Sequence, residues 1–365
     1  MDGTNQAGIS TKLGTHTEAC TPPIQYISVA IPRILYAIDI WGICFKRNAT
    51  IHAAGKVSEY NNKLTSIQRA GTLAITGGLR TSPTDTLDVH AFMLPLHLKI
   101  EKHLFRSAIC IATLPPQHPL HKPAKNCAAR ATRRHKSPLH DLMQTFNIKP
   151  SALETVAATG GNPATCHKQP FRLEIANDNE VSVTADTEGT EKARVYLDGS
   201  AQEGKVDAAA VLICPGKETR KLHYHLGTTE HHTVFEAKLV GMILGLHLIK
   251  TQKKRTSYSL GVDNQAALTA AASPGNRSGH YLADLFLTAA FNLRKTNGTA
   301  NYSLLLRWTA GHVKIEGNEL ADEEAKLAAE GLTSAATLLP RPLRKPLKQN
   351  KAAAKQTHNV KLKVA

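Results

Sequence analysis

The sequence lacks the features that mark secreted and membrane proteins. Its six cysteines form no Cys-x-x-Cys pair and precede no histidine at zinc-finger spacing, so we expect free thiols in a reducing compartment. The N-terminus is polar and carries no secretory signal. The longest apolar run, Val29–Phe45, is broken by Pro32, Arg33 and Asp39 and is too short to span a membrane. These absences predict an intracellular protein, with the nucleus as a candidate compartment, and no membrane partner.

Acidic residues are scarce in two segments of the chain. The tail 331–365 holds eight Lys or Arg residues and no acid, and segment 99–136 holds nine against Glu101 alone. Residues 191–330 are nearly balanced, with 17 basic and 15 acidic residues, although the whole chain carries a net charge of +16. Basic segments beside a balanced domain are expected if they bind a polyanion such as nucleic acid. Solubilising or targeting tails are the simpler alternative.

The residue pattern divides the chain into five segments. Residues 1–25 lack periodicity and are expected to be disordered, whereas 26–150 show mostly helical patterns. Residues 151–190 resemble a linker, with Gly pairs and an acid-rich run, and 191–330 have the pattern of a folded domain. The tail 331–365 is rich in Pro, Lys and Ala and is expected to be flexible.

The order of elements within 191–330 favours an α/β fold. Three strands come first and are followed by alternating helices and strands, which is typical of a mixed sheet with helices packed on it. We therefore expect a mixed five-stranded sheet flanked by helices and preceded by a mostly helical region. The expected strands are 194–199, 208–213, 221–227, 257–263 and 302–309, and the expected helices are 229–250, 264–295 and 316–330.

Four acidic residues lie where packing does not explain a carboxylate. Asp198 and Asp263 each end an apolar strand, and the carboxyl ends of neighbouring parallel strands meet at one edge of a sheet. Glu236 extends the apolar stripe of a helix backwards, and Asp322 lies in the last helix of the domain. Clustered carboxylates repel one another unless divalent cations neutralise them, and such oxygen ligands suit Mg²⁺ or Mn²⁺. The four residues therefore predict two-metal phosphodiester chemistry.

The motifs around these acids closely resemble those of ribonuclease H type 1. The resemblance covers about 194–330 and is carried by several short motifs in the same order, none of which would suffice alone. They are Tyr-Leu-Asp198-Gly-Ser, Val-Phe-Glu236-Ala, Val-Asp263-Asn-Gln-Ala, Gly-His312, Gly-Asn318 and Ala-Asp322. The resemblance implies a metal-dependent endonuclease that hydrolyses the RNA strand of RNA/DNA hybrids.

The resemblance also implies roles for individual residues. Asp198 would bridge two Mg²⁺ ions, for which Mn²⁺ is an alternative, while Asp263 and Glu236 complete one metal shell and Asp322 holds the other ion. His312 would shuttle a proton or assist product release. Asn318 would orient the His312 loop or a metal ligand, with helix capping as the competing role. The candidate readers of the hybrid are Gly199, Ser200, Asn264 and Gln265.

The flanks resemble a wider protein class. Residues 26–150 are similar to the region between polymerase and ribonuclease H in LINE-type (non-LTR) retrotransposon reverse transcriptases, through Ile67-Gln-Arg-Ala-Gly and Ile75-Thr-Gly-Gly-Leu-Arg. No polymerase Tyr/Phe-x-Asp-Asp motif is present, so we expect no polymerase activity. Two alternatives remain open. One is a catalytically inactive, nucleic-acid-binding retrotransposon remnant, and the other is a nuclease of the same fold that acts on DNA, such as an integrase.

Overall fold

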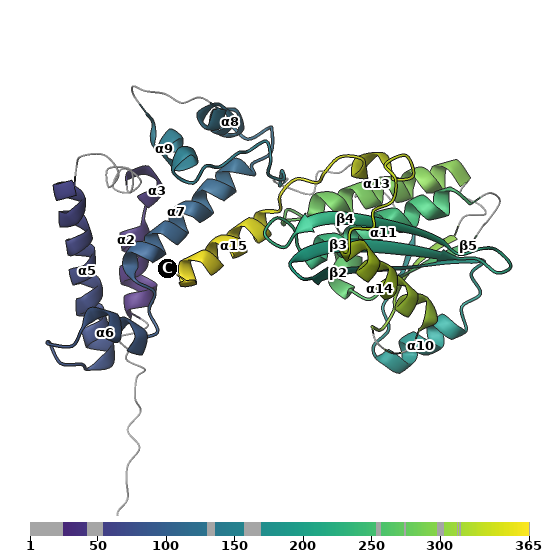
Figure 1. Cartoon of the computed structure of the whole chain (residues 1–365), viewed down its shortest axis with the longest axis horizontal. Coiled ribbons are helices and arrows are strands. Elements are labelled where there is room, and N and C mark those ends of the chain that lie inside the picture. The colour runs from purple at the N-terminus through teal and green to yellow at the C-terminus, as the bar shows by residue number, and fades with distance from the viewer. Residues whose placement is uncertain are drawn as a thin grey trace, which may run out of the picture. The chain divides into compact units, whose positions relative to one another are not determined.

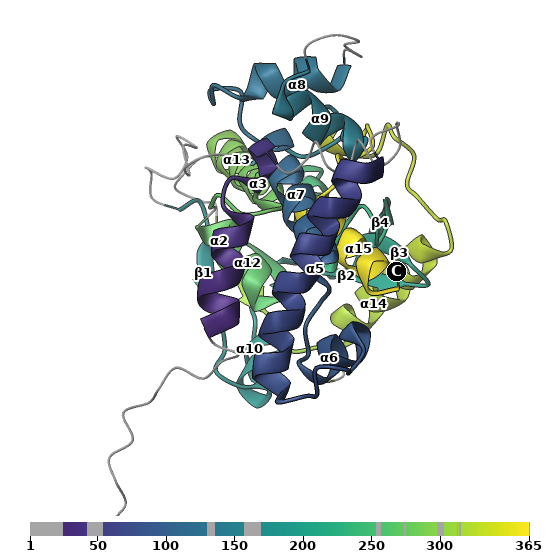
Figure 2. The ribbon, with the colours of Figure 1, turned by 90° about the vertical axis from the view of Figure 1, so that its left-hand side faces the viewer.

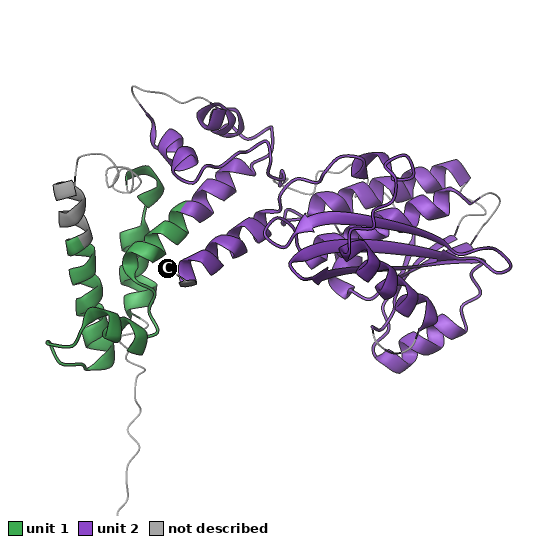
Figure 3. Cartoon of the chain, in the orientation of Figure 1, with its two compact units in different colours: residues 1–104 green, residues 105–365 purple. Residues whose placement is uncertain are grey.

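The computed structural model describes residues 25–41, 54–129, 136–156, 169–252, 257–273, 275–297, 303–311, 313 and 315–364. The chain divides into two compact units, Met1–Leu104 and Phe105–Ala365 (Figure 3). The division falls within helix α7 (Leu96–Ala112), so the boundary expected near residue 190 lies inside the second unit. None of the described helices is long and apolar enough to cross a bilayer.

The described part of the first unit consists of helices. Its longest helix is α5 (Figure 2). The helix ends just before Gly77, which takes a φ of +65° and whose N–H donates to the carbonyl of Leu73 at 2.9 Å. Leu64, Leu87 and Leu104 are among its buried side chains. The helices are η1 (Tyr26–Ala30), α2 (Ile31–Leu35), α3 (Ile38–Trp41), α5 (Ala54–Thr76), α6 (Thr84–His90) and the start of α7.

The second unit is built on a mixed sheet of six strands in the order β1-β6-β5-β2-β3-β4 (Figure 1). The five expected strands are all present, and β2 pairs with β5 in parallel, as the placement of Asp198 and Asp263 requires. The expected number was one too low, because β1 comes from the predicted linker and pairs with β6. The strands are β1 (Arg172–Glu174), β2 (Ala193–Gln202), β3 (Lys205–Ile213), β4 (Arg220–Thr228), β5 (Ser257–Val262) and β6 (Ser303–Trp308).

The hairpin between β2 and β3 has a two-residue turn. Gln202 pairs with Lys205, and the turn residues Glu203 and Gly204 have φ values of +50° and +78°. Positive φ at both positions is the geometry that joins antiparallel strands most tightly, and Gly adopts it without steric cost. Gly204 therefore takes its positive φ in this turn without strain.

Helices cover both faces of this sheet. Val195 and Leu197 of β2 belong to the main core with Leu239 and Ile243 of α11, while Tyr196 of β2 packs in a second cluster with residues of α14. Successive side chains of a strand point to opposite faces, so α11 and α14 lie on opposite sides of β2. The helices of this unit are α8 (His121–Ala129), α9 (Pro138–Thr145), α10 (Asn179–Thr187), α11 (Val234–Lys250), α12 (Gln265–Ala272), α13 (His280–Asn297), α14 (Glu316–Ala329), η3 (Arg341–Leu343) and α15 (Lys351–Val364).

The segment after α14 is held against the sheet, whereas its composition suggested a flexible tail. Leu339 and Leu343 are 3% and 1% exposed and belong to the main core. The Ser334 N–H donates to the carbonyl of His223 on β4 at 3.1 Å, and the Tyr224 hydroxyl donates to the carbonyl of Lys345 at 3.3 Å. Burial of two leucines outweighs the weak local preference of a Pro- and Lys-rich segment for any one conformation.

A buried carboxylate anchors the start of α15. Glu154 is 2% exposed, and its side chain accepts hydrogen bonds from the Ser278 hydroxyl, the Gly279 N–H at 2.8 Å and the Lys351 N–H at 2.7 Å. Asn350, 1% exposed, accepts bonds from the same Ser278 hydroxyl and from backbone N–H groups at the start of α15. The three-way junction joins α13, α15 and the segment before residue 157. We refer to it as the Glu154 junction.

Candidate functional site

A cleft of about 240 Å³ lies where the parallel pairing of β2 with β5 ends, although β2 itself continues to Gln202. It contains three of the four predicted acids, together with one acid and one lysine that the sequence analysis did not select. The lining residues are Asp198, Gly199, Ser200, Val234, Lys238, Asp263, Gly311, Asn318, Glu319 and Asp322.

The parallel pairing of β2 and β5 brings the two strand aspartates together. The last paired residues are Leu197 and Val262, so Asp198 and Asp263 follow at equivalent positions. Asp198 is 6% exposed, and Asp263 is partly exposed. The adjacency predicted from strand alternation is therefore present in the structure.

Helix α14 contributes the remaining acids of the cleft. Asp322 lines the cleft and forms an ion pair with Lys326, one helical turn later, with 2.7 Å between Asp322 Oδ2 and Lys326 Nζ. Glu319 lines it as well, next to Asn318. Asn318 is 6% exposed, and its side-chain oxygen has no hydrogen-bond partner among the described residues, so helix capping does not account for it.

Glu236 does not join this cleft. It is fully buried and forms a capping box with Thr233 at the start of α11: its carboxylate accepts the Thr233 N–H at 3.0 Å, and its own N–H donates to the Thr233 hydroxyl at 3.3 Å. Its Oε2 lies 3.5 Å from His232 Nδ1. In this structure the predicted third metal ligand therefore stabilises the first turn of its own helix.

Lys238 occupies the position in the cleft at which the prediction placed an acid. Its ammonium Nζ lies 2.5 Å from Asp198 Oδ1 and 2.8 Å from Asp263 Oδ2, and the residue is only 6% exposed. One buried cation thus joins the carboxylates of Asp198 and Asp263. The contact is possible because α11 begins close to β2: a Cβ on Gly199 would lie 2.5 Å from the backbone of Ala237.

The protonation of these groups follows from their mutual attraction. Burial by itself would lower the pKa of Lys238, but the charges and hydrogen bonds of Asp198 and Asp263 outweigh it and raise the pKa above its ordinary value. Lys238 is therefore a cation at neutral pH. Burial raises the pKa of Asp198, and the Lys238 ammonium opposes that rise.

Only some of the other predicted site residues line the cleft. Gly199 and Ser200 line the cleft, and the Ser200 hydroxyl is buried without a partner among the described residues. Asn264 caps α12, where its side chain accepts the Ala267 N–H at 2.9 Å, and Gln265 is exposed outside the cleft lining. His312 lies outside the described residues.

These residues do not fit a pair of divalent cations. An ammonium group already occupies one oxygen of each strand aspartate. Glu236 does not line the cleft, and its Oε2 accepts the N–H that caps α11. Among the described residues, no group of three or more His, Cys, Asp or Glu side chains is arranged to hold a metal ion. The predicted Mg²⁺ site is therefore not supported by the donor set that this chain presents.

A sequence signal for Lys238 was present but was not used. Gly241 and Gly245 follow it by three and seven residues, which places all three on one face of the helix. A Cβ on Gly241 would lie 3.1 Å from Leu197, and one on Gly245 would lie 2.6 Å from Leu260, so this face packs closest to β2 and β5. The glycine spacing therefore indicates that Lys238 points toward β2 and β5, where it contacts Asp198 and Asp263.

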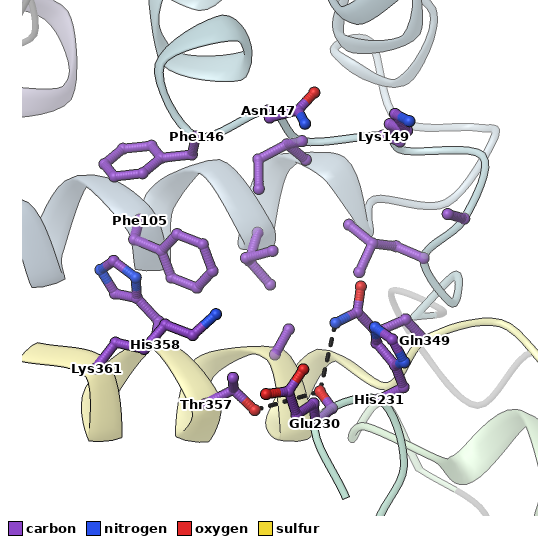
Figure 4. Close-up of a pocket in the computed structure, with 15 residues that line it drawn as sticks. Phe105, Phe146, Asn147, Lys149, Glu230, His231, Gln349, Thr357, His358 and Lys361 are labelled. Carbon is purple, nitrogen blue, oxygen red and sulfur yellow. Dashed lines mark hydrogen bonds between the residues drawn. The ribbon is translucent and has the colours of Figure 1, made fainter. Parts of the chain in front are cut away.

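A larger cavity, of about 440 Å³, lies apart from the acidic cleft in the second unit (Figure 4). Phe105 stacks on His358 of α15 with ring centroids 3.9 Å apart, and Phe146 meets Phe105 edge-on. Thr357 and Gln349 both donate to the carbonyl of Glu230. Aromatic contacts and backbone hydrogen bonds dominate this cavity, and its lining contains none of the predicted site residues.

The chain was compared with family models, curated proteins and solved structures. No family model and no curated protein matches the sequence. Among solved structures, the chain is similar to ribonuclease H1 from the halophilic archaeon Halobacterium salinarum NRC-1, at 16% identity and a TM-score of 0.29. The match covers 38% of this chain and 98% of that one.

Proposed function

We propose that the second unit binds RNA/DNA hybrids through the acidic cleft and a neighbouring basic surface, without hydrolysing them by a two-metal mechanism. The ribonuclease H-like motifs around Asp198, Asp263 and Asp322 support the choice of ligand. The Lys238 ammonium between Asp198 and Asp263 supports the absence of a two-metal hydrolytic step. The LINE-type origin suggested by residues 26–150 remains a prediction.

The observation that carries the proposal is a set of open polar atoms in the cleft. Ser200 Oγ, Asp263 Oδ1 and Asn318 Oδ1 are all buried and have no hydrogen-bond partner among the described residues. Buried polar atoms are usually hydrogen-bonded, so these three are open to a donor from water or from a bound ligand. Two of the three are pure acceptors, which suit a hydroxyl donor rather than a phosphate oxygen. The 2′-hydroxyl groups of RNA supply such donors, and DNA lacks them.

The charge of the cleft also favours hydroxyl groups over phosphate groups as its ligands. Asp198, Asp263, Glu319 and Asp322 line it with Lys238 as its lining cation, so the cleft repels phosphate groups and favours hydroxyl donors. Phosphates of the hybrid therefore need a separate positive surface. In nucleic-acid complexes such contacts supply much of the affinity.

The ordered tail supplies a positive surface of this kind. The side chains of Arg341, Arg344, Lys345 and Lys348, here named the tail strip, are exposed on a segment that Leu343 fixes in the core. No acid occurs in 331–365.

Two further cations lie near the tail strip. Lys250 ends α11, and the Arg220 guanidinium donates to the hydroxyl of the next residue, Thr251, at 2.6 Å. The pKa of His247 is lowered chiefly by burial, with further lowering by the charges of Lys250, Arg344 and Arg220. Lys238 and Lys250 lie on the same helix, about 18 Å apart at 1.5 Å per residue. One helix therefore connects the acidic cleft with the basic surface.

The direct test measures the binding of short labelled duplexes by fluorescence anisotropy over a range of salt concentrations. We expect hybrid to bind more tightly than duplex DNA of the same sequence, because DNA lacks the hydroxyl donors. The combined variant Arg341→Gln, Lys345→Gln and Lys348→Gln should weaken binding on the order of tenfold and reduce the salt slope by about 1 to 3.

The matched control removes the same charge elsewhere in the second unit. Lys295, Lys361 and Lys363 are exposed, and their combined change to Gln should leave the salt slope closer to that of the wild type. Equal loss in both triple variants would mean that overall charge, rather than the tail strip, holds the phosphates. Equal affinity for hybrid and duplex DNA would refute the role of the cleft in selecting RNA.

A further inference from the structure

We propose that the Lys238 ammonium takes the place of a divalent cation in the acidic cleft, and that this one residue prevents Mg²⁺ or Mn²⁺ from binding there. The proposal goes beyond hybrid binding, because it concerns which cation neutralises the carboxylates. It is also independent of hybrid binding, since metal binding is measured without nucleic acid.

The position of the ammonium is the first support. A cation that bridges two carboxylates must lie within bonding distance of both, and Lys238 Nζ does so at 2.5 Å and 2.8 Å. These are charge-assisted hydrogen bonds at or below the usual range of length. A metal ion bound between Asp198 and Asp263 would need the same two oxygen atoms. The ammonium and the ion therefore compete for one place.

The rigidity of α11 is the second support. Its first turn is fixed by the Thr233–Glu236 capping box, and Gly241 and Gly245 bring its next turns against β2 and β5. Residues 237–246 of the helix are all buried, so Lys238 has no nearby solvent-facing position to which its helix could rotate it. Displacing the ammonium would leave it buried without partners or force the long side chain out through the cleft opening.

The charge balance is the third support. Lys326 pairs with Asp322 at the rim of the same cleft, so two lysines contact three of the four acids and offset two of their four negative charges. A divalent cation binds carboxylates mainly because they are otherwise uncompensated. In this cleft the attraction for an external cation is reduced before any metal arrives.

A carboxylate at position 238 would reverse this situation. The glycine-marked face of α11 would then present an acid to Asp198 and Asp263, with Asp322 in the same cleft. Three or four carboxylates around one space, without an internal cation between the strand aspartates, form the oxygen-rich set that Mg²⁺ and Mn²⁺ prefer. The helix and both strands would need no change of path.

The test is a titration of MnCl₂ into the full chain by isothermal calorimetry, for the wild type, Lys238→Glu and Lys238→Gln. We expect the affinity of the cleft for Mn²⁺ in Lys238→Glu to exceed that of the wild type by roughly 10- to 100-fold or more, since even outer-shell partners of metal ligands change affinity by that factor. Lys238→Gln removes the competing cation without adding a ligand and should show a smaller gain. Adding Asp198→Asn to Lys238→Glu should abolish the gain.

Thermal unfolding in MnCl₂ provides the second readout. Lys238→Glu should be less stable than the wild type in chelator and should be stabilised by Mn²⁺, because a ligand that binds only the folded state raises the unfolding temperature. If this variant fails to fold even with Mn²⁺, the comparison of Lys238→Gln with the wild type decides. Equal Mn²⁺ affinity in those two proteins would overturn the proposal.

Hydrolysis provides the last discriminating measurement. RNA/DNA hybrid should remain intact with the wild type in Mg²⁺ or Mn²⁺, and any cleavage gained by Lys238→Glu should be lost when Asp198→Asn is added. Mn²⁺ binding or metal-dependent cleavage by the wild type, abolished by Asp198→Asn, would show that a metal ion displaces the ammonium and would refute the inference. Failure of hybrid binding alone would refute only the proposed function.

Discussion

Two buried carboxylates of the second unit are compensated in different ways. Glu154 is held by a hydroxyl and two backbone N–H groups from separate segments, whereas Asp198 shares the ammonium of Lys238 with Asp263. Burial raises the pKa of both acids. Backbone donors stay in place when a side chain is changed, but a lysine does not. The junction is therefore robust to most substitutions, whereas the charge balance of the cleft depends on one residue.

Removing Lys238 should cause the largest loss of stability. We expect Lys238→Met to destabilise the fold by about 3–5 kcal/mol at neutral pH, because two neighbouring carboxylates are left without their buried partner. The loss should shrink as the pH falls and those carboxylates become protonated. Urea unfolding of variant and wild type across the acidic range measures both effects. A loss that does not change with pH would indicate a packing defect instead.

The wild type should show the complementary behaviour in base. Because the folded-state pKa of Lys238 is raised above 10.5, its contribution is complete below that value and is lost as the pH rises through the folded pKa.

A change at the Glu154 junction should have a smaller effect. Glu154→Gln keeps the shape of the side chain but turns one acceptor into a donor that faces an N–H or hydroxyl group, and we expect a loss of about 1–3 kcal/mol. Because the folded-state pKa of Glu154 is raised, the charged form is disfavoured and the wild type should lose stability as the pH rises through the ordinary value of 4.5 toward the folded one. Glu154→Gln should remove that dependence, which urea unfolding at several pH values can measure.

The pKa of Glu324 is shifted in the opposite direction from that of Glu154. Burial would raise its pKa, but hydrogen bonds from Lys221 at 2.6 Å and His223 at 2.7 Å hold the pKa below its ordinary value of 4.5. Its contribution is therefore present above that value and is lost as the pH falls through the lower folded pKa. Glu324→Gln should be less stable than the wild type at neutral pH and should approach it in acid. An unchanged gap at all pH values would contradict this account.

The exposed lysine of the cleft rim should have the least effect. Lys326 pairs with Asp322 in solvent, where such ion pairs contribute little, so Lys326→Gln should leave the unfolding midpoint unchanged within error. The variant is the matched control for Lys238→Gln, since both remove one lysine that contacts a cleft aspartate. Equal destabilisation of the two would mean that burial does not distinguish these lysines.

Local patterns predicted five of the six strands and three of the four acids that line the cleft. Strand alternation and the parallel connection between the strands of Asp198 and Asp263 placed these residues side by side, and the structure agrees. Glu236 is buried, as the apolar stripe predicts, but it lies in the cap of α11 and outside the cleft, because such a stripe indicates which way a residue points and not what it contacts. Thr233 three residues earlier already formed the pattern of a capping box, which gave the acid a local role.

The tail was harder to predict for a different reason. Its composition favours no structure, and its order comes from contacts with residues far away in the sequence. Lys351 meets Glu154 across 197 positions, and Leu339 and Leu343 enter a core built by earlier strands and helices. Composition and periodicity carry no information about such contacts, so they could be found only in three dimensions.

The path of this tail also bears on how the protein behaves in solution. Strand β4 is the last strand of the sheet, and an open last strand offers unpaired backbone groups to other chains. The hydrogen bonds between Ser334 and His223 cover part of that edge with the chain's own backbone. A copy of the protein shortened before residue 334 would keep every strand yet expose this edge, and we expect it to self-associate by strand addition.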